Sequence, residues 1–357
     1  MIKELCIEVT DRCYLKCIHC SADAKEDLNP EVGFSTWRKA IDEFAEIGGK
    51  ILEISGGEPL TYPYIYKLIK FAKSKKLEVR LYTSGYLLDK ENIKKLQEVN
   101  VDKFILSIQG PNREVHDKIT GVDGSFDKIV ENIITLKKAG NWVGIHFVPI
   151  KPNFRYLQDT AKLTSKLGID EFAILRFVPQ GRGLINRKKL ELNKDEMKNL
   201  ISEFEKIKKD INLNIRIGRP FNIRYAMLDA VDNVKKCNAG ITKCLIKPNG
   251  DVAPCPAFKQ NKDYVMGNIK YESFKNIWQD SNRWEEFRNQ QYINTCFECS
   301  EFKFCGGGCP AQRNLHWGNL KTGPDPACVK RYCLEIKSIP MKNMAYRGNV
   351  YFNPFST

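Results

Sequence analysis

Residues 13–20 read Cys13-Tyr14-Leu15-Lys16-Cys17-Ile18-His19-Cys20, so three cysteines share one short stretch with the spacing C-x3-C-x2-C. Three thiolates on one tight loop can hold three irons of an iron–sulfur cube and leave the fourth iron open for chemistry. Zinc is the alternative, but it takes four ligands, and His19 could supply the fourth only from an awkward position beside Cys20. The stretch therefore indicates an enzyme with an open metal cluster.

The segment from residue 5 to about residue 180 alternates short apolar runs with amphipathic stretches. Near-continuous apolar runs are typical of parallel strands buried on both faces. The expected strands are Leu5–Thr10, Ile51–Ser55, Val79–Thr83, Phe104–Ile108, Val143–Ile150 and Phe172–Val178. Between them we expect helices over Ser35–Ile47, Tyr64–Ser74, Lys90–Val99, Phe126–Ala139 and Phe154–Leu167, with Ser35 as the cap of the first. Six such units predict an α/β fold, a partial (β/α)6 parallel barrel whose ligands lie at the C-terminal ends of the strands.

Composition excludes several classes of protein. Of the 357 residues 42% are hydrophobic and 28% charged, and no apolar run approaches the roughly 18 residues of a membrane span. Met1 leads directly into the first expected strand, which predicts no signal peptide and a cytoplasmic protein. The net charge of +14 indicates either an acidic partner or lysines spread over helix faces. We favour the second interpretation and expect no nucleic-acid partner, because no basic stripe interleaved with aromatic residues is present.

The distribution of cysteine predicts the domain organisation. Nine of the thirteen cysteines fall between Cys237 and Cys333, and none lies between Cys20 and Cys237. Disulfides are rare in cytosolic proteins, so the spacing indicates two metal-binding regions. We expect a barrel over 1–185, a bridging segment over 186–229, a small cysteine-rich domain over 230–335 and a tail over 336–357. The cysteine-rich domain has few apolar residues, which predicts that metal holds it together.

The second expected strand is followed by Ser55-Gly56-Gly57-Glu58-Pro59. The two glycines would let backbone amides approach a ligand closely, and Glu58 offers a carboxylate for an ammonium group. Taken alone, the same residues are equally typical of a simple turn.

Together these two motifs resemble the radical S-adenosylmethionine superfamily. The resemblance implies that Cys13, Cys17 and Cys20 bind a [4Fe–4S] cluster whose open iron chelates the methionine end of S-adenosylmethionine. One electron from the cluster then cleaves this cofactor to methionine and a 5′-deoxyadenosyl radical, which abstracts a hydrogen atom. The resemblance also assigns cofactor contacts: the adenine to His19, the methionine end to Gly56, Gly57 and Glu58, and the ribose to Ser107.

The sequence departs from the family pattern at two positions. Gln109 stands where many relatives have aspartate, and Thr120 stands where a cofactor-binding arginine is common. Arg176, expected at the end of the sixth strand, or Lys118 would compensate, and we assign the cofactor contact to Arg176.

The C-terminal cysteines resemble a SPASM domain, which holds two auxiliary [4Fe–4S] clusters and would bring the total to three. The resemblance assigns the first auxiliary cluster to Cys237, Cys244, Cys255 and Cys309, and the second to Cys296, Cys299, Cys305 and Cys328. Cys296–Cys309 alone would also suit a zinc knuckle. Cys6 is expected to be a buried thiol and Cys333 a surplus structural one.

Enzymes with this pair of domains mostly act on peptides, so we expect a cross-link, oxidation or decarboxylation on a ribosomal peptide. The alternative is a radical decarboxylase or dehydrogenase of a small molecule such as a tetrapyrrole or aminoglycoside. A non-enzymatic electron carrier is disfavoured by the open iron, and sulfatase maturation by Pro256. The electron is expected from a flavodoxin or ferredoxin, and the enzyme is expected to be oxygen-sensitive. His146, Gln180 and Arg182 are candidates at the barrel mouth for handling the proton after hydrogen abstraction, and for each of them we favour a merely structural or substrate-orienting role.

Overall fold

The computed structural model describes residues 1–25, 31–218, 237–289, 296, 298–299, 302, 306–326 and 328. They belong to two compact units. The first consists of Met1–Gly218 and Asn238–Arg288, and the second of Arg219–Cys237 and Asn289–Thr357. Cys305, Cys333 and the predicted tail over 336–357 lie outside the described residues. The domain boundaries predicted from the sequence, at residues 185, 229 and 335, are based on motifs rather than on packing. They stay a proposal about which segments bind which clusters.

The first unit is built on one curved sheet. In the described residues this sheet has ten strands. Neighbouring strands are hydrogen-bonded in the order β10-β9-β8-β1-β2-β3-β4-β5-β6-β7. The strand bounds are β1 Glu4–Glu8, β2 Ile51–Ser55, β3 Glu78–Tyr82, β4 Lys103–Ser107, β5 Val143–Phe147, β6 Glu171–Ile174, β7 Ile215–Ile217, β8 Lys243–Ile246, β9 Asp251–Ala253 and β10 Gly267–Asn268. Strands β1 to β6 are all parallel to their neighbours, so the predicted partial barrel is confirmed.

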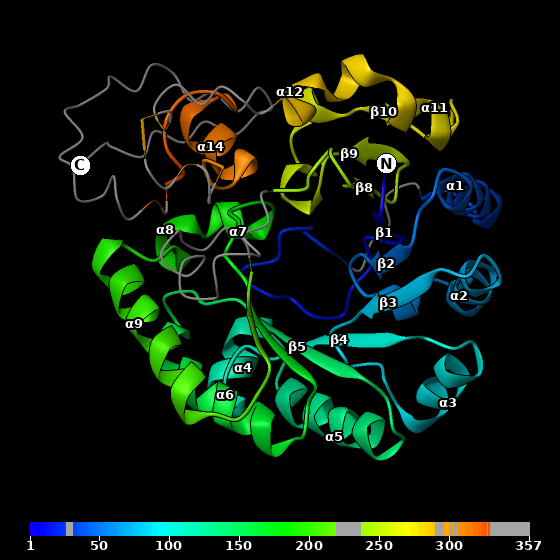
Figure 1. The fold of residues 1–357 in the computed structure, drawn as a ribbon. Helices are drawn as coiled ribbons and strands as arrows, with labels where there is room; N and C mark the ends of the chain where they lie inside the picture. Colours follow the sequence, from blue (N-terminus) through cyan, green and yellow to red (C-terminus); the bar gives the residue numbers. More distant parts are fainter. Residues whose placement is uncertain are drawn as a thin grey trace. The chain divides into compact units, whose positions relative to one another are not determined.

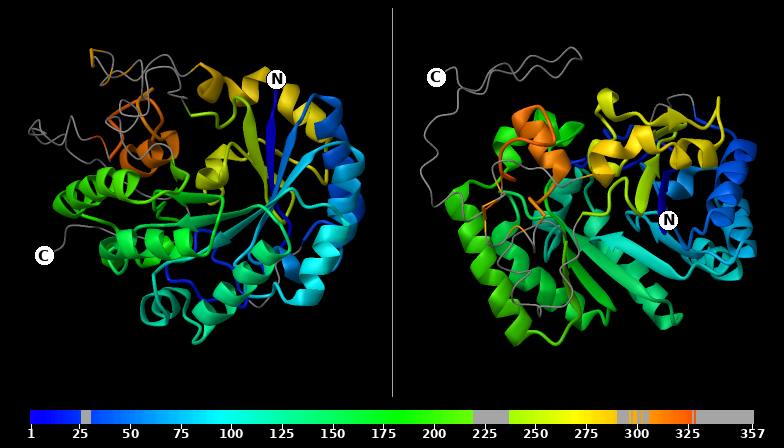
Figure 2. Two further views of the ribbon diagram at one scale, coloured as in Figure 1. Left: turned by 60° about the horizontal axis from the view of Figure 1, so that its bottom comes forward. Right: turned by 45° about the horizontal axis from the view of Figure 1, so that its top comes forward.

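Helices lie on the outer side of these strands, and the loop that follows β1 runs on the inner side (Figure 1). The helices of the first unit are α1 Phe34–Glu46, α2 Ile65–Ser74, α3 Lys90–Glu98, α4 Arg113–Thr120, α5 Ser125–Lys138, α6 Leu157–Lys166, α7 Arg182–Ile185, α8 Arg187–Leu190, α9 Lys194–Asp210, α11 Phe274–Gln279 and α12 Glu285–Arg288. Figure 2 shows the same strands from two other directions, fanning across the unit with the helices outside them. In the described part of the chain, no helix combines the length and the apolar character needed to cross a membrane.

Helix α1 shows how the sequence pattern produces this layer. Trp37, Ala40, Ile41 and Phe44 recur at helical spacing and are all buried, which gives the helix one apolar face for the sheet. The prediction that Ser35 caps this helix is wrong. The helix begins one residue earlier, after Gly33, and no side chain caps its N-terminus.

Two strands from outside the predicted barrel extend the sheet at its edges. β7 pairs in parallel with β6, and β8 pairs in parallel with β1 through the register Glu4 to Lys243. Part of the cysteine-rich region thereby joins the barrel unit. Since an edge strand exposes unpaired backbone groups, this pairing also satisfies the edge of β1.

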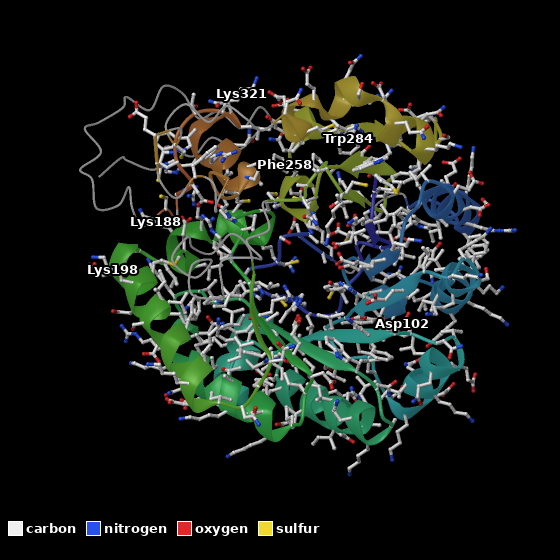
Figure 3. All side chains as sticks on the ribbon, viewed as in Figure 1. Asp102, Lys188, Lys198, Phe258, Trp284 and Lys321 are labelled. Carbon is white, nitrogen blue, oxygen red and sulfur yellow. The ribbon has the colours of Figure 1, made fainter. Side chains whose placement is uncertain are left out.

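Aromatic packing gives residues 238–288 a core that the sequence analysis did not expect. The rings of Phe258 and Phe287 lie 5.2 Å apart in an edge-on contact, and those of Trp278 and Trp284 lie 4.8 Å apart. Figure 3 labels Phe258 and Trp284 within this part of the unit. The expectation that this region lacks apolar packing of its own is therefore wrong for these residues, because sheet pairing and aromatic burial stabilise them, while the role of metal stays a prediction.

Basic side chains are found on the outer helices. Lys188 of α8 and Lys198 of α9 are both exposed and are labelled in Figure 3 on the outside of the green helices. Lys206 on α9 pairs with Glu203 of its own helix. On these helices the positive charge is therefore spread over solvated surface.

A buried ion pair connects β8 to the barrel. Lys243 Nζ lies 2.6 Å from Glu53 Oε2 on β2, and the Tyr82 hydroxyl of β3 donates to the other Glu53 oxygen at 2.9 Å. Burial alone would raise the pKa of Glu53, but the Lys243 charge and these hydrogen bonds bring it below its usual range. The carboxylate is therefore ionised and paired across three strands.

Replacing Lys243 with Met should be strongly destabilising, because it leaves the buried Glu53 carboxylate without its cation. We expect the free energy of unfolding to fall by about 3–5 kcal/mol. The measurement is anaerobic urea denaturation of the reconstituted protein, and the double change Lys243→Met with Glu53→Leu should recover most of the loss. Lys95→Met is the matched control, since Lys95 pairs with Glu91 one turn away on an exposed face, and it should leave the urea midpoint almost unchanged. An equal loss in both variants would contradict the expectation.

Candidate functional site

The three N-terminal cysteines lie on the loop of residues 9–25 that follows β1, which we call the cysteine loop. Its backbone is closed at the base, where the Cys13 amide donates to the Lys25 carbonyl at 2.9 Å. The Cys20 amide donates to the Cys17 carbonyl at 3.2 Å, which closes a tight turn between the last two cysteines. All three thiols pack in one small apolar cluster with Leu15, Ala22, Ala24, Tyr86 and Val122.

The loop after β2 binds the cysteine loop on one side. The Gly57 amide donates to the Thr10 carbonyl at 2.7 Å, and the Glu58 amide donates to the Arg12 carbonyl at 2.6 Å. A Cβ atom on Gly57 would lie 2.3 Å from the Arg12 oxygen, so only glycine allows this approach. In the structure these two amides hold the cysteine loop, and the predicted approach of this glycine segment to a ligand stays a prediction.

Helix α4 binds the cysteine loop from another side. The amides of Lys16 and Ile18 donate to the carbonyls of Thr120 and Ile119, at 2.8 and 2.9 Å. These acceptors belong to the last turn of α4, whose carbonyls have no partners within the helix. The last carbonyls of α4 thus gain hydrogen-bond donors from the cysteine loop, and the middle of the loop is fixed to the end of the helix.

The segment after β6 forms the third support. The Arg182 guanidinium donates through Nε to the Cys17 carbonyl at 3.0 Å and through Nη1 to the Ala24 carbonyl at 2.5 Å. The Asn186 side chain donates to the Ile18 carbonyl at 3.0 Å. Three segments that are distant in sequence therefore hold one loop.

The Glu58 carboxylate is fully engaged by the loop after β3. It accepts from the Thr83 hydroxyl at 2.6 Å, from the Ser84 hydroxyl at 2.5 Å, from the Ser84 amide at 2.9 Å and from the Leu60 amide at 3.3 Å. Burial raises its pKa, and these hydrogen bonds offset part of that effect. The side chain fixes the loops after β2 and β3 to each other, in addition to any contact with an ammonium group.

Buried nitrogen atoms without partners gather at this site. Among the described residues, six buried side-chain nitrogen or oxygen atoms have no hydrogen-bond partner, and four of them are Arg12 Nε, His19 Nδ1, His116 Nε2 and Arg182 Nη2. Arg12 and His19 belong to the cysteine loop, and Arg182 binds it. An unpaired buried polar atom is costly, so such a concentration indicates a place where a bound group completes the structure.

The protonation states at the site are set by burial. Burial lowers the pKa of His19 to about 4, helped by the nearby positive charges of His116 and Arg182, so the imidazole is neutral at pH 7. Burial raises the pKa of the Cys13 thiol to about 12 and raises that of Cys17 further, with the Cys20 and Cys13 charges adding to it. Thiols of this kind ionise when a cationic metal centre binds them, with release of protons.

The donor set fits an iron–sulfur cluster better than a zinc ion. A zinc ion needs four ligands converging on one point, and the described residues contain no group of three or more His, Cys, Asp or Glu side chains placed to hold a single ion. A cluster instead takes each thiolate on a separate iron atom. Cys13, Cys17 and Cys20 would hold it.

The other residues predicted to contact the cofactor lie at strand ends. Ser107 is the last residue of β4 and is the register partner of His146 on the adjacent strand β5. Arg176 comes two residues after the end of β6. Both are half-buried. Their contacts with the cofactor stay predictions.

The two departures from the family pattern have structural roles. Gln109 Oε1 accepts from the Val148 amide at 3.0 Å, so this side chain fixes the loop after β5. The Thr120 hydroxyl lies 2.8 Å from that of Ser125 at the start of α5. Both side chains are buried, and each stabilises a loop at the C-terminal side of the strands.

The predicted auxiliary ligands are divided between the two units. In the first unit, Cys244 is buried on β8, and Cys255 follows β9 at the start of a short 3-10 turn, Pro256–Phe258. In the second unit, Asp325 fixes two more: its carboxylate accepts from the Cys309 amide at 2.7 Å and its carbonyl accepts from the Cys328 amide at 2.8 Å. Helix α14, Pro310–Trp317, starts directly after Cys309. Cys305 lies outside the described residues.

A buried arginine organises the second unit. Arg313 of α14 donates to the Gly307 carbonyl at 2.6 Å and to the Leu320 carbonyl at 3.1 Å. Burial lowers its pKa, while nearby Asp325, Cys309, Cys296 and Cys237 counteract the shift. Three of the predicted ligands therefore lie within electrostatic range of one guanidinium.

Comparison with known proteins finds a family model for the barrel strands and another for the cysteine-rich region. Residues 7–164 match the Radical SAM superfamily, and residues 237–300 match the SPASM iron–sulfur cluster-binding domain. The mycofactocin maturase MftC of Mycobacterium tuberculosis is 31% identical over 90% of this chain and 82% of its own. The chain belongs to the radical SAM superfamily. It is a radical SAM enzyme with a C-terminal SPASM domain, and membership implies iron–sulfur clusters and S-adenosylmethionine as its cofactors.

Other relatives span nearly the whole chain. The AdoMet-dependent heme synthase of Oleidesulfovibrio alaskensis is 28% identical over 90% of this chain and 86% of its own, and the PqqA peptide cyclase of Gluconobacter oxydans is 26% identical over 99% and 98%. Among solved structures, Streptococcus suis SuiB bound to its precursor peptide SuiA superposes with a TM-score of 0.77, covering 92% of this chain and 76% of SuiB at 21% identity. That likeness shows the shared fold.

Sequence reasoning gave Arg182 too small a role in this radical SAM enzyme. It named Arg182 as a structural, substrate-orienting or proton-handling candidate without a stated partner, whereas the structure shows that its guanidinium binds the cysteine loop. The available signal was the pair Gly181 and Gly183 on either side of it, because two glycines around one arginine indicate a close approach of backbones. Gln180 likewise has a structural role: it donates to the Pro256 carbonyl at 3.2 Å and accepts from the Gln260 amide at 3.2 Å.

His146 of β5 is a neutral acceptor rather than an acid. Its Nε2 lies 3.2 Å from Arg216 Nη2, and its ring lies 5.4 Å from that of Tyr82. Burial, together with the positive charges of Arg216 and Lys243, lowers the pKa of His146 to about 3.

The pH dependence of stability should therefore carry a contribution from His146. In the unfolded chain its pKa is near 6.5, so between about pH 6.5 and 3 the unfolded state binds a proton that the folded state does not. Stability should fall with decreasing pH through this window, by up to about 1.4 kcal/mol per pH unit for this group. Urea midpoints measured anaerobically between pH 7 and 5 should show a shallower fall in His146→Gln. A wild-type slope in that variant would contradict the assignment.

Proposed function

We propose that this radical SAM enzyme cleaves S-adenosylmethionine reductively at a cluster held by Cys13, Cys17 and Cys20 and abstracts a hydrogen atom from a peptide. The outcome on the peptide would be a cross-link, an oxidation or a decarboxylation. The observation that supports this most is the buried three-thiol loop, fixed from three sides and surrounded by unpartnered nitrogen atoms. Such a site suits a bound cluster and its cofactor better than a structural metal.

When bound, the cluster supplies one electron to the sulfonium of S-adenosylmethionine and so starts the radical reaction. The residues of the chain orient the cofactor. Neutral His19 would contact the adenine without adding charge, and Ser107 would bind the ribose. Gly56, Gly57 and Glu58 would meet the methionine end, and Arg176 its carboxylate.

The auxiliary clusters are assigned by motif position. Cys237, Cys244, Cys255 and Cys309 would hold the first, and Cys296, Cys299, Cys305 and Cys328 the second. With the N-terminal cluster this makes three [4Fe–4S] clusters. An auxiliary cluster can accept an electron from the substrate or position it, which suits an oxidative modification.

The peptide assignment is supported by the relatives and by the SPASM domain. One relative, at 26% identity over nearly its whole length, is a PqqA peptide cyclase. The second candidate is a radical decarboxylase or dehydrogenase of a small molecule such as a tetrapyrrole or aminoglycoside. It is favoured by the 28% identity to an AdoMet-dependent heme synthase over 90% of this chain. We further propose a cytoplasmic, oxygen-sensitive enzyme that takes electrons from a flavodoxin or ferredoxin.

Replacing Cys13, Cys17 and Cys20 together with Ala should remove one cluster and all cofactor cleavage. Iron analysis of anaerobically reconstituted protein should fall from about twelve to about eight irons per chain. Formation of 5′-deoxyadenosine after reduction with dithionite, followed by chromatography, should be abolished. Cys6→Ala is the matched control, because Cys6 is a buried thiol in the adjoining strand β1, and it should keep both iron and cleavage. Loss of only two irons in the triple variant would contradict the assignment.

A peptide substrate should accelerate cofactor cleavage and supply the abstracted hydrogen. Short peptides encoded beside the gene, made with deuterium at candidate carbons, should transfer deuterium to 5′-deoxyadenosine, as read by mass spectrometry. Porphyrin and aminoglycoside metabolites serve as the comparison set. Deuterium transfer from a member of that set and from no peptide would reverse the choice in favour of the small-molecule reaction.

A further inference from the structure

Arg182 contacts the cysteine loop from outside it at Cys17, Asp23 and Ala24. Nε donates to the Cys17 carbonyl, and Nη1 donates to the Ala24 carbonyl and lies 3.3 Å from Asp23 Oδ1. The planar guanidinium thus joins a point between the cysteines to the point where the loop returns to the barrel. A lysine has no fork of this kind and cannot make both bonds in one geometry.

The segment around Arg182 is shaped for this contact. Gly181 has φ +52°, and a Cβ atom there would lie 2.8 Å from both the Asp23 amide and the Cys20 carbonyl. A Cβ atom on Gly183 would already contact the His19 carbonyl at 3.1 Å. Both glycines therefore allow the segment to lie against the cysteine loop, which brings Arg182 to it.

One nitrogen of Arg182 has no partner among the residues that the structure describes. Nη2 is buried and makes no hydrogen bond, although Nε and Nη1 of the same group are bonded to the cysteine loop. The guanidinium also places a positive charge directly beside the backbone of Cys17, whose carbonyl accepts from Nε at 3.0 Å. A donor and a positive charge beside cluster sulfurs stabilise the more negative, reduced form of a cluster.

We propose that Arg182 is a positioning residue for the N-terminal cluster, with two separable effects. Nε and Nη1 hold the loop in the shape that retains the cluster, and Nη2 with the guanidinium charge makes the cluster easier to reduce. The relevant step is the uptake of one electron from an external reductant, with no bond of the protein made or broken. This proposal rests on the proposed function, because it assumes that Cys13, Cys17 and Cys20 bind a cluster.

The test compares anaerobically reconstituted wild type with Arg182→Gln and Arg182→Lys. In the glutamine variant we expect iron release to a chelator to be about tenfold faster, the size expected for one lost charge-assisted hydrogen bond. We also expect the midpoint potential of the N-terminal cluster, from an electron-paramagnetic-resonance titration with dithionite, to be more negative. The lysine variant should lose iron faster than wild type and keep a potential close to it. Arg187→Gln is the matched control, because Arg187 pairs with Glu191 within one helical turn, and it should leave both readouts unchanged.

Two outcomes would overturn the proposal separately from the proposed function. A glutamine variant with wild-type iron release and wild-type potential would exclude any role toward the cluster. If the glutamine variant fails to fold by circular dichroism, the lysine variant decides, and wild-type iron release in it would exclude the loop-holding role. A wild type that binds no N-terminal cluster would instead overturn the proposed function.

Discussion

The structure depends on one constraint, which is that the cysteine loop forms no helix or strand and must be held largely from outside. Its internal hydrogen bonds, such as that from the Cys13 amide to the Lys25 carbonyl, satisfy only part of its backbone. The loop after β2, the end of α4 and the segment around Arg182 supply the missing partners. The barrel brings these segments together, because loops that follow parallel strands all emerge at one edge of the sheet. The shape of the cysteine loop therefore depends on the correct folding of the barrel.

The first half of the cysteine-rich region completes the barrel as well as carrying proposed ligands. Strand β8 extends the sheet beside β1, and Lys243 on it neutralises a buried carboxylate of β2. A second buried pair, between Lys259 and Glu8 at 2.7 Å, ties the segment after Cys255 to the end of β1. Such pairs are expensive to break, so they favour one placement of this segment on the sheet. The segment with Cys255 is thereby fixed close to the strand from which the cysteine loop starts.

Several residues of the family motifs stabilise the loops at the strand ends, in addition to their proposed contacts with the cofactor. Gly57 is glycine because the Arg12 carbonyl leaves no room for a side chain, and Glu58 joins two loops through three hydrogen bonds from Thr83 and Ser84. Gln109 fixes the loop after β5 in place of the aspartate that is common in the family. These positions therefore combine tight packing at the strand ends with the proposed contacts to the cofactor, and the departure at Gln109 is accommodated by the backbone of a neighbouring loop.

The sequence by itself determined the barrel strands, the family and the candidate ligands. Apolar runs of strand length and the C-x3-C-x2-C spacing are local patterns, and local patterns can be read without coordinates. It did not predict that Ser35 would fail to cap α1, or that β8 would pair with β1 across more than two hundred residues of chain. Only the tertiary structure decided what holds the cysteine loop, because Arg182 meets Cys17 through a backbone carbonyl, and every residue has one. A hydrogen bond to a backbone carbonyl does not require a particular amino acid at the accepting position. The sequence therefore does not show which residue Arg182 binds, and only the fold does.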